Sequence, residues 1–156
     1  MASIVDMVRD VITPDVIRGA SNVIGENAVA TQSALKVAAP TVLAGALSIS
    51  STSSGAENLF NTITNGRYGA DLLGGVGRML ESRGATDSLL RCGEGLTSSL
   101  FGGKSDAVTD AVARSGGVSM DSAGKLLRLA APLVLSVLGK QIASRGLDAG
   151  GLANML

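Results

Sequence analysis

The sequence carries one apolar, proline-containing segment twice, and this repetition constrains the fold more than any other feature. The first copy is KVAAPTVLAGAL around Pro40, and the second is RLAAPLVLSVLGK around Pro132. Between Lys125 and Lys140 the chain is apolar apart from Arg128 and Ser136, and residues 34–49 have the same character. A helix that is apolar on all sides belongs in the interior of a protein. We therefore expect two central helices.

Each proline should disturb the helix that contains it. Proline has no N–H and crowds the carbonyl four residues earlier, which is that of Lys36 for Pro40 and of Arg128 for Pro132. We therefore predict that both central helices are kinked or split. A long basic side chain one turn before the proline can lay its methylene groups on apolar surface and hold its charge at the edge of the bundle. We assign this structural role to Lys36 and Arg128.

The rest of the chain predicts an all-α, glycine-rich multi-helix bundle. Apolar residues recur at spacings of three and four, and there are only two phenylalanines, one tyrosine and no tryptophan. We expect a helix over 13–25 with Thr13 as its N-cap, one over 70–84 ended by Gly84, and one over 105–116. In the last, Ser105 should cap, Gly116 should terminate, and the buried stripe should comprise Ala107, Val108, Ala111 and Val112.

The 21 glycines need a packing explanation. A glycine inside a helix costs about 1 kcal/mol relative to alanine, so intrinsic propensity cannot hold these helices. Small residues let helix axes approach closely. We expect such contacts at Ala38, Ala39, Ala44, Gly45 and Ala46, and at Ala130, Ala131, Ser136 and Gly139.

The repeated segment indicates an internal duplication. Residues 35, 38, 39, 40, 42 and 43 are identical to residues 127, 130, 131, 132, 134 and 135, and the match resumes where Ala56, Leu59 and Asn61 face Ala149, Leu152 and Asn154. We divide the chain into a first helical unit at 1–66, a linking helix at 67–85 and a second helical unit at 86–156, packed as one compact domain. Each unit should contain a long central helix followed by a short amphipathic one.

The composition excludes most enzymatic and ligand-binding chemistry. The chain has no histidine, so it lacks an ordinary Ser-His-Asp triad and an imidazole metal site. Its glycine pairs do not match a phosphate-binding loop. Thirteen basic residues balance thirteen acidic ones, which disfavours nucleic acid as a partner. We expect no catalytic, cofactor or metal site, and we expect the single cysteine, Cys92, to be a part-buried inert thiol.

The C-terminal part resembles a known family. The order DAVTDAVARSGG, VSMDSAGKLLRLAAPLVLSVLGKQ, GLDAGGLANML is similar to the bacterial YidB-like family of unknown function, over residues 105–156. The first unit joins this resemblance only through the internal match. The resemblance implies a bacterial source and a helical fold, and it carries no catalytic motif.

Two functions remain open from the sequence. The first is a non-enzymatic structural or interaction module, cytoplasmic, whose partner is a second copy of itself, with a protein cargo as a further candidate partner. Its interface is predicted at Ile4, Val5, Val8, Leu72, Val76 and Leu80. The second is a membrane-active protein that inserts its apolar central helices. The run from Leu126 to Gly139 is shorter than the roughly 20 apolar residues that span a bilayer, so we place self-association first.

Overall fold

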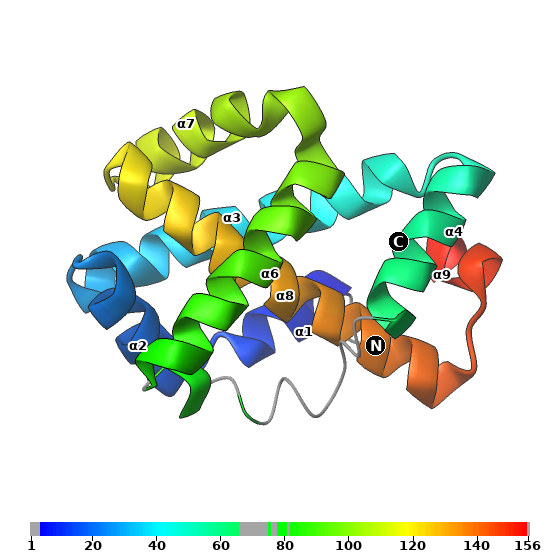
Figure 1. Ribbon diagram of the computed structural model, residues 1–156, viewed down its shortest axis with the longest axis horizontal. Helices are drawn as coiled ribbons and strands as arrows, with labels where there is room; N and C mark the ends of the chain where they lie inside the picture. Colours follow the sequence, from blue (N-terminus) through cyan, green and yellow to red (C-terminus); the bar gives the residue numbers. More distant parts are fainter. Residues whose placement is uncertain (1–3, 66–74, 76–77, 81, 156) are drawn as a thin grey trace.

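The computed structural model describes residues 4–65, 75, 78–80 and 82–155, and it is helical (Figure 1). The described part contains no strand, which confirms the all-α class. The elements are α1 (Ile4–Val11), α2 (Pro14–Ile24), α3 (Ala28–Ile49), α4 (Ser53–Asn65), α6 (Arg83–Phe101), the 3-10 turn η1 (Gly102–Lys104), α7 (Ser105–Gly116), α8 (Met120–Arg145) and α9 (Ala149–Met155).

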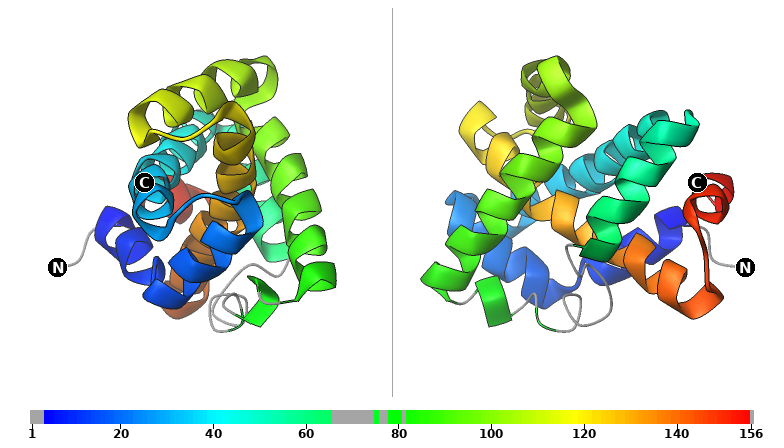
Figure 2. Two further views of the ribbon diagram at one scale, coloured as in Figure 1. Left: turned by 90° about the vertical axis from the view of Figure 1, so that its left-hand side faces the viewer. Right: turned by 45° about the vertical axis from the view of Figure 1, so that its right-hand side comes forward.

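Helix α8 is the centre of the bundle, as predicted. All residues from Leu129 to Gly139 are buried, and α8 contacts α1, α2, α3, α4, α6 and α7. Figures 1 and 2 show its middle turns passing through the molecule with the other helices around them. The apolar character of this helix on all sides is therefore explained by burial.

Helix α3 departs from the prediction that it is central. One side packs on α7 and α8 through buried residues that include Ala34, Ala38 and Val42. Its other side is open: Val29 is 75% exposed and Leu47 is 49% exposed. The sequence similarity between the two segments thus hides a difference in burial, because α3 lies at the edge of the bundle.

Neither of the two predicted central helices is split at its proline, and a kink there stays a prediction. Both Pro40 and Pro132 lie inside helices that continue without interruption. At Pro132 the missing N–H leaves the carbonyl of Arg128 without its usual helical donor. Gly93 of α6 lies directly against this carbonyl: a Cβ on Gly93 would overlap its oxygen and lie 2.7 Å from the Cα of Arg128. The neighbouring helix therefore approaches α8 at the turn that the proline alters.

Other small residues also mark close helix contacts, as expected. A Cβ on Gly116 of α7 would lie 2.8 Å from the Cα of Ala34 in α3. One on Gly19 would lie 2.6 Å from Cβ of Leu80, and one on Gly45 would meet the ring of Phe101 at 2.7 Å. Ala44 is the exception among the predicted small-residue contacts, because it is exposed.

The predicted helix ends are partly correct. The Thr13 hydroxyl accepts a hydrogen bond from the N–H of Val16 at 3.3 Å, and Pro14 is the first helical residue. Helix α7 is capped differently from the prediction: Ser105 is its first residue and makes no cap, and the left-handed residue after its end is Gly117 (φ 70°).

The other corrections concern Gly84 and the buried face of α7. Gly84 lies in the first turn of α6, whose N-cap is Ser82, so Gly84 ends no helix. In α7, Ala107 and Ala111 are exposed, Val108 is half-buried, and the buried residues are Val112, Ala113 and Gly116. The face is rotated because Gly116 lies on α3.

The order of elements agrees with part of the two-unit description. A long helix followed by a short one occurs at α3–α4 and again at α8–α9, and α4 packs on α9. The boundary predicted between residues 85 and 86 falls within α6. The duplication itself stays a prediction.

Ser136 provides a stability prediction for the core. It lies in the middle of α8, is fully buried, and its hydroxyl has no hydrogen-bond partner in the described part of the chain. Because an unpaired buried hydroxyl is destabilising, we expect Ser136→Ala to raise the free energy of unfolding by about 1 kcal/mol. Chemical denaturation measures this change. Ser144→Ala is the control, since Ser144 is exposed on the same helix and its hydroxyl donates to the Lys140 carbonyl at 2.8 Å. A loss of stability in Ser136→Ala would contradict the prediction.

Candidate interaction surface

The exposed side of α3 is a candidate interaction surface. Residues at spacings of three and four lie along one side of this helix and are exposed or half-buried. We call this surface the outer face of α3; it comprises Val29, Ser33, Lys36, Pro40, Ala44 and Leu47. It extends over the helix length, which is roughly 33 Å for 22 residues.

The outer face of α3 has the composition of a contact surface. Lys36 is its only charged residue, whereas the exposed sides of α2 and α7 carry ion pairs, Arg18–Asp15 at 3.4 Å and Arg114–Asp110 at 3.1 Å. The solvent-facing side of a helix in a globular protein normally carries charged residues. Large exposed apolar patches, in contrast, usually mark an interface. The scarcity of charge therefore distinguishes this face from those of α2 and α7.

Helix α1 borders this face on one side. A small hollow lies between α1 and α3, and its lining residues are Val8, Arg9, Ile12, Lys36, Ala39, Pro40 and Leu43. Lys36 is exposed and lies beside Pro40. From the sequence we expect its charge at the edge of the bundle. Arg128 is half-buried on α8. The structure thus brings each basic residue close to its proline along the same helix.

The interface residues predicted from the sequence do not form this surface. Val8 is only 2% exposed and Leu80 only 7%, and both belong to the apolar core, so neither side chain is available to a partner. Ile4 and Val5 lie in α1, but their side chains are outside the described part, and Leu72 and Val76 are outside the described residues altogether. The prediction is therefore wrong for Val8 and Leu80, because both of these side chains face inward.

The sequence did contain a signal for the outer face of α3. In α8 no charged residue occurs between Arg128 and Lys140, whereas α3 has Gln32, Ser33 and Lys36 close together on one side. Three polar residues in five positions mark a side that faces water. The apolar residues one to three turns further along, Pro40, Ala44 and Leu47, continue that side.

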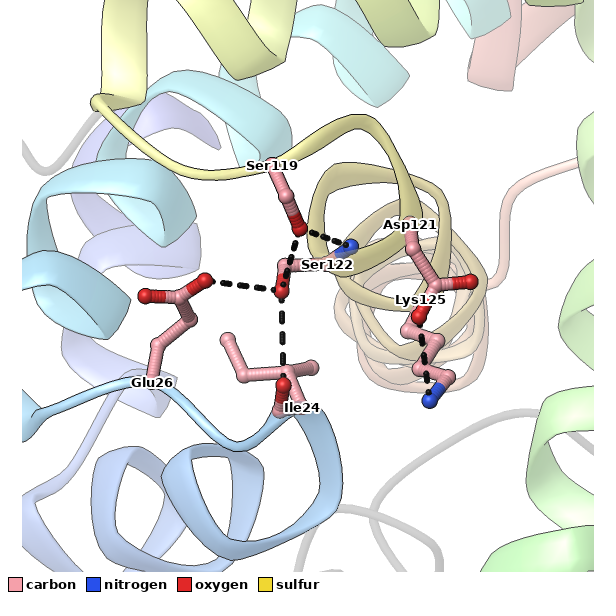
Figure 3. Close-up of polar contacts among 6 residues, drawn as sticks. All are labelled: Ile24, Glu26, Ser119, Asp121, Ser122 and Lys125. Carbon is pink, nitrogen blue, oxygen red and sulfur yellow. Dashed lines mark hydrogen bonds and ion pairs between the residues drawn. The ribbon is translucent and has the colours of Figure 1, made fainter.

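A polar network holds the start of α8 against the loop between α2 and α3 (Figure 3). The Ser122 hydroxyl lies 3.3 Å from the Ile24 carbonyl, 3.0 Å from Oε1 of Glu26 and 3.0 Å from the Ser119 hydroxyl. Ser119 is the N-cap of α8 and accepts from the N–H of Ser122. A carboxylate at a helix N-terminus is favourable. This network explains how α2 and α8, distant in sequence, are fixed together.

The same residues do not form a catalytic site. Ser122 and Lys125 are three positions apart, a spacing that could pair a nucleophile with a base. Figure 3 shows them pointing to different sides, because Lys125 binds Asp121 at 3.3 Å while Ser122 faces Glu26. Ser122 is also buried, at 3% exposure. Its hydroxyl therefore has a structural role.

Other candidates for chemistry are dispersed over the surface. Within the described residues, no group of three or more cysteine or acidic side chains is placed to hold a metal ion. Cys92 is exposed on α6, which corrects the expectation of a part-buried thiol.

Comparison with known proteins gives a family and no activity. A family model described as "Bacterial protein of unknown function (DUF937)" matches residues 6–141. No curated protein and no solved structure matches. The matched range includes the first unit as well as most of the second, whereas the sequence resemblance covered mainly residues 105–156. The match covers most of the 156 residues, and the chain therefore belongs to the DUF937 family of bacterial proteins of unknown function.

Proposed function

We propose that this protein is a non-enzymatic structural or interaction module that self-associates through the outer face of α3. The observation that carries the proposal is the exposure of an apolar helix with a single charge on its open side. Burying apolar surface is favourable by roughly 25 cal/mol per Å2. A second copy supplies a matching apolar surface without further partners.

The geometry of the outer face suits a symmetric pair. Two copies of one surface can meet about a twofold axis, and then each residue contacts its counterpart region on the partner. Pro40 and Ala44 lie near the middle of the face and are small, so two helices can approach closely there. Lys36 lies at the side that borders α1, from which its long side chain can reach water. The zero net charge of the chain adds no repulsion.

The proposal is tested by the mass of the protein in solution. Size exclusion coupled to light scattering should give a species larger than 15.5 kDa whose mass increases with concentration. Ala44→Asp should shift the equilibrium to the monomer, because it places an unpaired charge in a dry contact. Ala44 is exposed, so the fold should be unaffected.

The matched control is Ala111→Asp on α7. Ala111 is also an exposed helical alanine, and it lies on α7 next to Asp110, which pairs with Arg114. We expect this variant to associate like the wild type. A single 15.5 kDa species at all concentrations, or equal dissociation by both variants, would overturn the proposal.

We also propose a family resemblance, an internal duplication and a cellular location for this protein, each of them suggested by the sequence. The similarity to the YidB-like family and the paired Pro40 and Pro132 segments support a duplicated YidB-like protein, acting in the cytoplasm. The α3–α4 and α8–α9 order supports this proposal.

Membrane insertion is the second candidate function. In the described residues, α3 and α8 have apolar windows with mean hydropathy 1.2 and 1.5 and are long enough to span a bilayer. The window in α8 is 78% buried, and that in α3 is 39% buried. Insertion would require α8 to leave the core, whereas self-association leaves the fold intact. Flotation with neutral liposomes distinguishes the two, because co-flotation of wild-type protein would favour insertion.

A further inference from the structure

A groove of about 570 Å3 lies between α4, α6 and α8, beside the end of α3. Its apolar lining comprises Ile49, Leu59, Leu96, Leu100 and Leu135. Four of these are leucines in the buried core, so the floor is fixed by the packing that holds the bundle together. The volume falls in the range of roughly 300–1,000 Å3 that is typical of ligand sites.

The polar lining is a row of neutral groups, most of them on α4. It comprises Asn58, Asn61, Thr62 and Asn65 on α4, with Ser99 on α6. The Thr62 hydroxyl donates to the Asn58 carbonyl at 2.8 Å and is thereby occupied. The side-chain amides of Asn58, Asn61 and Asn65 are exposed and make no hydrogen bond within the described part of the chain. Each amide can both donate and accept.

The charge of the groove restricts its ligand. None of the described residues that line it is ionisable. A phosphate, carboxylate or ammonium group placed there would lose its hydration without gaining an opposite charge. The ligand should therefore be neutral and should offer both donors and acceptors to the asparagines, together with apolar groups for the leucines.

The geometry points to an uncharged, extended peptide segment of a partner protein as the ligand of this groove. Its backbone supplies donors and acceptors, and alternate side chains point to the same side. Asn61 and Asn65 are about 6 Å apart along the helix axis, close to the roughly 6.6 Å two-residue repeat of an extended strand. Apolar side chains at alternate positions would meet the leucine floor. This inference does not rest on self-association, because no residue of the outer face of α3 is among the residues described as lining the groove.

The experiment uses two pools of hexapeptides with blocked ends. One pool has leucine or valine at odd positions and serine, threonine or asparagine at even positions; the other has the same sequences with N-methylated backbones. We expect the unmodified pool to shift the side-chain amide NMR signals of Asn58, Asn61 and Asn65. The N-methylated pool should bind much less, because it lacks backbone N–H donors.

Substitutions test the individual contacts. Asn61→Ala and Asn65→Ala should each weaken binding about fivefold, the loss of one hydrogen bond. Asn22→Ala on α2 is the matched control, since Asn22 is exposed and lies outside the groove, and it should bind like the wild type. The Ala44→Asp variant should also bind normally, which separates this site from the outer face of α3.

Three results would overturn the inference. The first is the absence of shifts with the unmodified pool. The second is equal binding of the N-methylated pool, which would indicate apolar contact without backbone recognition. The third is unchanged binding by both asparagine variants.

Discussion

Gly93→Ala should destabilise the protein by about 3 kcal/mol or more, a large effect for the addition of one methyl group. The new Cβ would overlap the carbonyl carbon and oxygen of Arg128, which belong to a buried helix and cannot rotate away as a side chain can. Helices α6 and α8 would have to separate. Thermal unfolding followed by circular dichroism should show a melting temperature lower by about 6–12 °C.

Gly95→Ala is the control for this substitution. Gly95 lies on the same helix, and a Cβ there would meet nothing within 4 Å. Alanine is the better helix former, so Gly95→Ala should stabilise the protein by up to about 1 kcal/mol. The two substitutions are two residues apart and should have opposite signs. If both substitutions stabilised the protein, helix propensity, and not the contact with Arg128, would determine the outcome.

Val8→Asp should strongly destabilise the protein. Val8 is 2% exposed in the main core cluster, where an ionised carboxylate would lose its hydration; Arg9 and Lys36 line the same hollow, but both of these residues are exposed. The loss should be about 4 kcal/mol or more, a large part of the 5–15 kcal/mol that stabilises a typical domain. Far-ultraviolet circular dichroism and chemical denaturation measure it.

Val29→Asp is the matched control for Val8→Asp. Val29 is 75% exposed in the first turn of α3, where an acidic residue is favourable. It should retain wild-type helix content, and its stability should match that of the wild type when both are monomeric, because Val29 belongs to the outer face of α3. If Val8→Asp dissociated an oligomer and kept its helix content, Val8 would be an interface residue as the sequence first suggested.

The sequence was sufficient for the fold class and for the central helix, but burial differed between the two similar segments. The periodicity of α2 and the continuous apolar run of α8 depend on local spacing, which a sequence displays directly. Helix α6 is a different case: no helix is predicted over this range from the sequence, because seven of its 19 residues are glycine, serine or cysteine and the apolar stripe is interrupted. Its place is determined by Gly93 fitting against Arg128, a contact between residues 35 positions apart.

The candidate sites were less predictable than the fold. Val8 and the outer face of α3 are both parts of apolar helices, and only the packing of α1 on α3 and α8 decides which side chains are covered. The peptide groove is formed by α4, α6 and α8 together. In the sequence, its asparagines are indistinguishable from the polar residues of any solvent-exposed helix side. The groove depends on how these three helices pack, and the spacing of residues within α4 does not predict it.

The contact between Gly93 and Arg128 also sets the alignment of two helices along their length. If α6 slid by one turn relative to α8, Leu89 or Thr97 would stand opposite the Arg128 carbonyl, and their Cβ atoms would not fit. Gly95 points elsewhere and offers no alternative place for the crossing. Proline usually destabilises the interior of a helix. Here its missing N–H leaves the Arg128 carbonyl without a helical donor, and Gly93 is the residue of α6 that packs against this carbonyl. Pro132 and Gly93 together therefore determine the position of α6 along the axis of α8.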